Sequence, residues 1–319
     1  MNNRVLHLIV IITSSILAVS CATTPVSPQS EELAPFTAEL LASQPDDAFT
    51  AVYPIGDEKL IWLGAKHENQ LDSLTFQLIA DAYEQFSIDT VIIEGVETSQ
   101  GPSPQPLLES VSADAAKARD GFQPGGETVP TVLGAVRGGA VVIGGEPDDK
   151  DILRRLIQQG LTEADILGFY TMRSIPQWIR ERKITDASDP KIEPLLLDEL
   201  EWNRSALDIP KNVLPDVEAW RGWYKAKNGK PLGADFTTEE AGPRADGRFG
   251  TNEVGSAISR ARASHLHELV LSHLNSGETV FVVYGASHLM IHRPALDATL
   301  GASCYLGSDL KEVAQICSN

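Results

Sequence analysis

Four short apolar runs, each closely followed by glycine, most constrain how this 319-residue chain can fold. They occupy residues 60–63, 90–93, 140–143 and 280–284. A continuous apolar run of this length is typical of a strand that is covered on both faces, as in a parallel sheet. Helical patterns lie between the runs. The alternation predicts an α/β fold with a mainly parallel sheet flanked by helices.

The middle of the chain differs from both ends. Residues 151–276 carry no strong strand pattern, so we expect a helical insertion there, between the early strands and the last major strand. Residues 228–255, rich in glycine and charge, interrupt it. An irregular stretch this long is typical of a lid or a mobile loop. Residues 51–319 are then expected to form a single domain.

The N-terminus has the pattern of an export signal. Arg4 and an apolar stretch at 6–17 precede Ala18-Val-Ser-Cys21, so residues 1–20 are expected to be a lipoprotein-type signal peptide with Cys21 as the lipidated residue. Ordinary cleavage or an uncleaved anchor are the alternatives, because Ala18 stands where such signals usually carry leucine. Residues 21–50, with several prolines among polar residues, are expected to be a flexible tether. The chain is therefore expected outside the cytoplasm, lipid-anchored to the cell envelope membrane on its periplasmic or outer-surface side.

Charge and cysteine usage narrow the possible partners. The chain has 26 basic and 44 acidic residues, a formal charge of −18. Nucleic acids and anionic lipid headgroups need a basic footprint, so neither is expected as a ligand. A peptide or small-molecule substrate is compatible with this charge. In an oxidising compartment Cys304 and Cys317 are expected to form a disulfide, and two separate buried thiols are the alternative.

Polar side chains follow the four predicted strands. His67 comes after the first, Glu94 after the second, Glu146 after the third and His288 after the fourth. Ligands bind beyond the carboxyl ends of strands in open parallel sheets. Each residue alone has a simpler interpretation, as a loop histidine or a helix cap. Together they predict one site, as ligands of a divalent metal or as a general acid/base set.

The stretch "SRARASHLHELV", residues 259–270, supplies two further candidates. On a helix Arg262 and His265 share an otherwise apolar face, where they are costly to bury unless paired. They are expected to reach a carboxylate or a ligand, and a structural Arg–Glu pair is the alternative. His267 falls on the opposite face and is expected to face solvent. His273 and His292 have no spacing that singles them out.

Other catalytic chemistries have no support in the sequence. There is no Gly-X-Ser-X-Gly elbow, no cysteine of the mature chain beside a candidate base, and no complete phosphate-binding loop. Serine, cysteine and nucleotide chemistry are therefore not expected.

With these residues assembled, the chain resembles the superfamily of TraB, PrgY, GumN, Tiki, erythromycin esterase and ChaN-type proteins. The resemblance rests on Gly64-Ala-Lys-His67, Glu94 in "IIEG", Arg262 or Arg260, and Gly285-Ala-Ser-His288. It covers residues 52–305 and implies one α/β domain with helical insertions and a site built from these residues. Glu146 is not part of the motif.

The resemblance implies more than one function. Tiki members are similar to metalloproteases that depend on Mn or Co, and we expect a metal-dependent hydrolase of peptide or amide bonds. His67, Glu94 and His288 would bind Mn, Co or Zn. Arg262 would stabilise an oxyanion, with Glu146 or His265 as base. A haem- or ligand-binding ChaN-type lipoprotein without catalysis is the alternative. A surface regulator that acts through a peptide partner is a third hypothesis.

Overall fold

One mixed, mostly parallel sheet organises the chain. The computed structural model describes residues 33–180 and 182–317. The sheet has the strand order β4-β3-β5-β2-β1-β6. Its strands are β1 (Phe49–Ile55), β2 (Glu58–Ala65), β3 (Thr90–Glu97), β4 (Val141–Glu146), β5 (Val280–Gly285) and β6 (Tyr305–Gly307). Strands β4, β3, β5 and β2 run parallel, and β1 is antiparallel to both of its neighbours. The fold is thus α/β, as the sequence predicted.

The four apolar runs correspond to the four parallel strands. Strand β1 had no such signal, because it begins in the segment assigned to the tether and contains Pro54. Gly56 and Asp57 join it to β2, and Ile55 pairs with Glu58 across this two-residue turn. Gly56 takes a positive φ of 62° there, a backbone conformation that suits glycine in tight hairpins.

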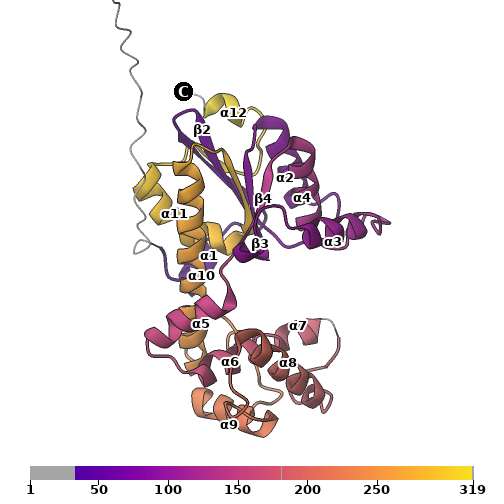
Figure 1. The fold of residues 1–319 in the computed structure, drawn as a ribbon, viewed down its shortest axis with the longest axis vertical. Coiled ribbons are helices and arrows are strands. Elements are labelled where there is room, and N and C mark those ends of the chain that lie inside the picture. The colour runs from indigo at the N-terminus through magenta and orange to yellow at the C-terminus, as the bar shows by residue number, and fades with distance from the viewer. Residues whose placement is uncertain (1–32, 181, 318–319) are drawn as a thin grey trace, which may run out of the picture.

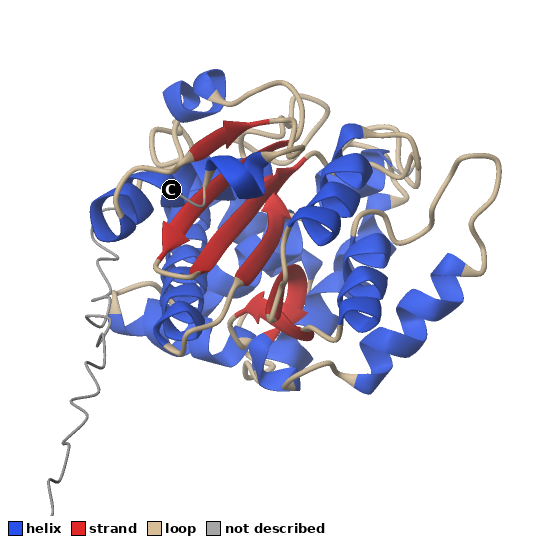
Figure 2. Ribbon diagram, turned by 90° about the horizontal axis from the view of Figure 1, so that it is seen from above, coloured by secondary structure: helices blue, strands red, loops and turns tan. Residues whose placement is uncertain are grey.

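Helices cover both faces of the sheet (Figures 1 and 2). Side chains alternate along β2, so that Ile61 and Leu63 enter one core while Leu60 and Trp62 enter the other. The first core contains residues of α2 (Leu74–Gln85), α3 (Gln105–Ala115), α4 (Thr128–Gly138) and α12 (Val313–Ile316). The second contains residues of α10 (Gly250–Asn275) and α11 (Ala286–Leu300).

A third core is wholly helical. It is built from α5 (Asp149–Gln158), α6 (Glu163–Met172), α7 (Ile175–Arg180), α8 (Ile192–Leu207), α9 (Val217–Asn228) and the first part of α10. These helices lie below the sheet in Figure 1. Trp178, Trp220 and Trp223 are buried in this core, whereas Trp202 is 61% exposed. Helix α10 reaches from this core to the sheet, which places its middle turns beside the strand ends.

Buried polar contacts connect the irregular stretch that ends in α10 to its neighbours. The carboxylate of Glu240 is fully buried and accepts hydrogen bonds from the Tyr224 hydroxyl and from Lys230 Nζ, the latter at 3.0 Å. The backbone carbonyl of Glu240 accepts a further bond from Thr251 Oγ1 at 2.7 Å. A buried carboxylate with these partners ties the stretch to α9 and α10.

The N-terminal segment is attached to the domain before residue 51. The backbone N–H of Ala34 donates to the Ile291 carbonyl at 2.9 Å, and that of Ala245 donates to the Phe36 carbonyl at 2.8 Å. Helix α1 (Ala38–Ser43) follows. The expected signal peptide and the expected lipidation residue Cys21 lie outside the described residues. No helix within 33–180 and 182–317 is long and apolar enough to cross a membrane.

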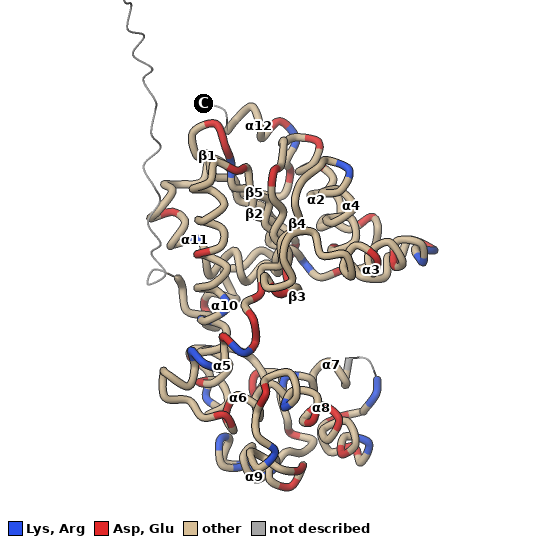
Figure 3. Tube along the Cα trace, in the orientation of Figure 1, with Lys and Arg blue, Asp and Glu red and all other residues tan. Residues whose placement is uncertain are grey.

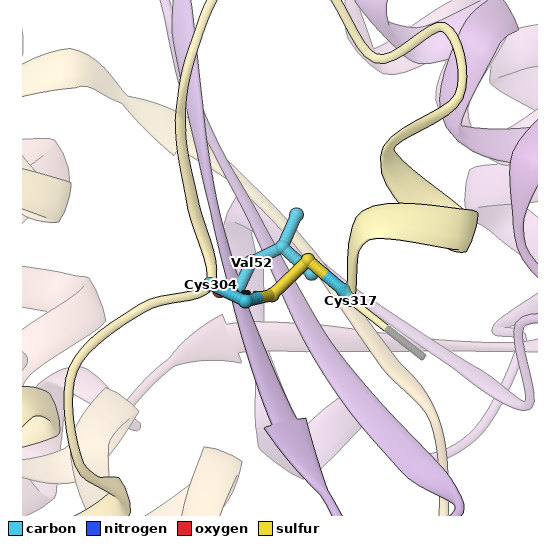
Figure 4. Close-up of a disulfide and its surroundings, with 3 residues drawn as sticks. All are labelled: Val52, Cys304 and Cys317. Carbon is cyan, nitrogen blue, oxygen red and sulfur yellow. Dashed lines mark hydrogen bonds between the residues drawn. A yellow bond between two sulfur atoms is a disulfide. The ribbon is translucent and has the colours of Figure 1, made fainter. Parts of the chain in front are cut away.

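A disulfide closes the C-terminal segment (Figure 4). Cys304 and Cys317, which are 13 positions apart, are bonded to each other. The backbone N–H of Cys304 donates to the Val52 carbonyl at 2.9 Å, next to the pairing of β6 with β1. The bridge therefore connects the end of the chain to the antiparallel edge of the sheet.

Candidate functional site

The two Gly-Ala-X-His turns lie side by side. Strands β2 and β5 are parallel neighbours, with Gly64 opposite Tyr284 and Ala65 opposite Gly285. Both turns therefore leave the same edge of the sheet. His67 lies in the loop after β2, whereas His288 lies in the first turn of α11, which begins directly after Gly285.

Glu94 lies between the two imidazoles. Its Oε2 accepts a hydrogen bond from the Gly285 backbone N–H at 2.7 Å and lies 3.8 Å from His67 Nε2. Its Oε1 lies 3.6 Å from His288 Nε2 and 3.7 Å from Arg262 Nη2. The structure thus brings His67, Glu94, His288 and Arg262 together at the carboxyl edge of the sheet.

The glycines of the two turns are required by close contacts. A Cβ atom on Gly285 would lie 2.8 Å from His67 Nε2 and 3.4 Å from Glu94 Oε2. A Cβ atom on Gly64 would lie 3.1 Å from the Ala286 Cα, at the start of α11. The glycines of the repeated motif therefore allow the two turns to pack against each other and leave room for the site residues.

Glu127 is a site residue that the sequence did not reveal. Its Oε1 lies 2.5 Å from His67 Nδ1, and its side chain is 16% exposed. Because Nδ1 donates to this carboxylate, His67 presents Nε2 toward Glu94. Glu127 immediately precedes α4, where an acidic residue is common as a helix cap, so its position alone gave no functional signal.

Arg262 makes a bidentate ion pair with Glu146. Its Nε donates to Glu146 Oε2 at 2.7 Å and its Nη2 donates to Oε1 at 2.6 Å. Burial alone would raise the pKa of Glu146, but the hydrogen bonds and charge of Arg262 outweigh it and hold that pKa below its usual value. Glu146 is therefore ionised and occupied, which makes it a weak candidate for a general base.

His265 lies on the same helix but is engaged elsewhere. Its Nε2 is 2.8 Å from Thr98 Oγ1, and that hydroxyl donates to the Gly144 carbonyl at 2.6 Å. The hydroxyl has one hydrogen, so His265 Nε2 is the donor in this chain. His265 thus supports η2 (Thr98–Gln100) and the end of β4. Arg260 is exposed, so Arg262 is the arginine that reaches the site.

The expectation that His267 faces solvent was wrong. Its side chain is fully buried. The first half of helix α10 packs in the third core and the second half packs against the sheet and α11, so the buried face of the helix changes along its length. Such a change defeats an assignment based on a single apolar stripe.

A small cavity lies beside the carboxylates of Glu94 and Glu127. It has a volume of about 120 Å³, and His67, Glu94, Glu127 and Thr128 are among its lining residues. This volume holds a few water molecules or one small polar group and is below the roughly 300 Å³ at which pockets for drug-sized ligands begin. A substrate would therefore place only its reacting group here.

The donor chemistry suits a divalent cation. Three carboxylates (Glu94, Glu127 and Glu146) and one guanidinium give the site a charge of −3 + 1 = −2 when the histidines are neutral. Acidic positions also continue along the connection from β4 to α5 (Figure 3). Two imidazole nitrogens and a carboxylate suit Mn, Co or Zn, and a carboxylate bound to the distal nitrogen of a ligating histidine is a common support. As they stand, no three His, Cys, Asp or Glu side chains in the described part of the chain form a metal-binding group.

Comparison with known proteins gives no match. No protein-family model, no curated protein and no solved structure is significantly similar to this chain.

Proposed function

We propose that this chain is a metal-dependent hydrolase of peptide or amide bonds. The observation that carries the proposal is the approach of His67 Nε2 and His288 Nε2 to opposite oxygens of Glu94, at 3.8 and 3.6 Å. Small side-chain movements would bring these three groups onto one ion. A bound divalent ion supplies a polarising charge and a water of lowered pKa.

The surrounding residues have supporting roles in this proposal. Glu127 fixes the tautomer and orientation of His67. Glu146 holds Arg262 in place, which replaces its expected role as a base. Arg262 keeps Nη2 within 3.7 Å of Glu94, where its charge would stabilise an oxyanion that develops at the site.

The helices between β4 and β5 are part of the same proposal. We interpret the segment 151–276 as an insertion whose last helix delivers Arg262 to a site otherwise made by the strand ends. The bulk of a peptide substrate would then lie outside the small cavity, between the strand ends and these helices.

The haem-binding alternative has less support. The cavity beside His67 is about 120 Å³, too small for a macrocycle in this conformation. Export and lipid anchoring rest on the sequence around Cys21. The Cys21→Ser variant tests them, since normal processing and unchanged detergent partitioning of that variant would exclude lipidation.

The experiment that tests the proposal combines metal analysis with turnover. The purified chain is loaded with Mn, Co or Zn, dialysed, analysed for metal and assayed on a library of quenched peptides. We expect one ion per chain and metal-dependent cleavage. His67→Ala and His288→Ala should lose both.

A matched control is His273→Ala. His273 lies on α10, and its Nδ1 pairs with Glu278 at 2.8 Å, outside the site. This variant should retain both metal and turnover. If His67→Ala and His288→Ala bind as much metal as the control, the proposed metal site is wrong.

A further inference from the structure

Behind the candidate site lies a buried cluster of aromatic nitrogens without partners. We call it the imidazole cluster: His267 on α10, His288 and His292 on α11, and Trp62 on β2. The side chains of His267, His292 and Trp62 are fully buried, and His288 is 9% exposed. The His292 ring lies 5.8 Å from the His267 ring and 4.6 Å from the Trp62 ring, between centroids.

The cluster contains six buried nitrogen atoms that lack a hydrogen-bond partner among the described residues. They are both ring nitrogens of His267, both of His292, Nδ1 of His288 and Nε1 of Trp62. Nearly all buried polar groups in proteins are hydrogen-bonded, to protein or to ordered water. Six such atoms at one place therefore indicate a hydrogen-bonding partner other than the described side chains.

The missing partner has to be small, neutral and able both to donate and to accept. Burial lowers the pKa of His267 and of His292, so both rings are neutral near pH 7 and each carries one donor and one acceptor nitrogen. The electrostatic neighbours of His292 are two further imidazoles, His267 and His288. These features fit water and disfavour an ion.

A cavity borders the turns of α10 and α11 that carry the cluster. It has a volume of about 380 Å³, and Ala263 and Ser264 of α10 and Ile291 of α11 are among its lining residues. His267 follows Ala263 by one helical turn, and His292 is the neighbour of Ile291.

We propose that the imidazole cluster encloses ordered water molecules that position His288. Six nitrogens at about three hydrogen bonds per buried water correspond to about two waters. One of them hydrogen-bonds Nδ1 of His288 and holds the ring with Nε2 facing Glu94, 3.6 Å from its Oε1. These waters do for His288 what Glu127 does for His67. The inference needs no metal, so it stands or falls apart from the proposed function.

The test counts long-lived internal waters by water-oxygen magnetic relaxation dispersion in the metal-free full chain. The wild-type signal should exceed that of the double variant His267→Phe/His292→Phe by about two waters, because the apolar rings of the variant fill the same space. The control His273→Phe replaces a histidine that already has a protein partner and should keep the full signal. An equal signal in all three proteins would overturn the proposal.

The Nδ1 atom of His288 provides an independent readout. Nitrogen NMR of the metal-free chain should show a His288 Nδ1 signal shifted by a hydrogen bond in the wild type, and a changed Nδ1 signal in the double variant. An Nδ1 signal that is the same in both proteins would refute the positioning role. Should the double variant fail to fold, a high-resolution crystal structure of the wild type decides. Water density within 3.2 Å of the cluster nitrogens supports the proposal, and an empty cluster refutes it.

Discussion

Removal of the Arg262 guanidinium should be among the most destabilising single changes in the site. In Arg262→Met the Glu146 carboxylate keeps only two long contacts, from the Gly95 N–H at 3.3 Å and the Tyr284 hydroxyl at 3.4 Å. Its side chain is 14% exposed, so water compensates little. Loss of one partner of a buried ion pair costs about 3–5 kcal/mol of unfolding free energy.

A double-mutant cycle separates this pair from its surroundings. Unfolding free energies are measured by urea denaturation at pH 7 for Arg262→Met, Glu146→Gln and the double variant. The loss of unfolding free energy in the double variant should be smaller than the sum of the losses in the two single variants. The difference, which is the coupling energy of the pair, should be about 2–3 kcal/mol. Costs that add to within about 0.5 kcal/mol would refute the ion pair described above.

The same cycle has a pH signature. The pKa of Glu146 in the folded state lies below its ordinary value of 4.5, so the unfolded chain binds a proton more readily. The stabilisation by the pair is therefore complete above about pH 4.5 and is lost as the pH falls through the folded pKa. In Glu146→Gln this component of acid denaturation should be absent.

Three further predictions follow from the site and the core behind it. Gly285→Ala should reduce metal binding without unfolding the chain, because its Cβ would lie 2.8 Å from His67 Nε2; metal analysis and circular dichroism of the variant check this. Glu127→Gln should weaken metal affinity by about 10–100-fold through the orientation of His67, as measured by competition with a chelator; unchanged affinity would remove Glu127 from the site. Burial lowers the pKa of His267 and of His292. The unfolding free energy should therefore be highest above about pH 6.5 and should fall below it, by up to about 1.4 kcal/mol per pH unit for each ring. Urea denaturation between pH 5 and 7 measures this slope. A His267→Phe/His292→Phe chain with the same slope would contradict this.

The parallel strands were predictable because their signal is local. Each is largely buried on both faces, so the chain at 60–63, 90–93, 140–143 and 280–284 is almost entirely apolar. The sequence also favours a short final strand at 303–306, and β6 lies at Tyr305–Gly307. Strand β1 was not predicted, because its pairing with β2 and β6 decides its structure more than its composition does.

Long-range pairing explains most of what the sequence left undecided about the site. The carboxyl ends of parallel strands meet at one edge, so His67, Glu94 and His288 could be expected together from their positions alone. Glu127 could not, since it lies before a helix 60 positions from its partner. The burial of His267 was equally hidden, because the face that α10 buries changes between its two halves.

The roles of the two strand-end glutamates depend on where one arginine binds. Glu94 and Glu146 occupy equivalent places in the sequence, each following a buried strand, and Arg262 lies within reach of both. Its Nη2 lies 2.6 Å from Glu146 Oε1 and 3.7 Å from Glu94 Oε1. Arg262 thereby compensates the charge of Glu146, while Glu94 keeps an oxygen facing each imidazole. No pattern within either strand could distinguish the two carboxylates, because the difference is set by an arginine 116 positions beyond Glu146. The same difference makes Glu94, and not Glu146, the residue whose replacement should abolish metal binding while leaving the Arg262 ion pair intact.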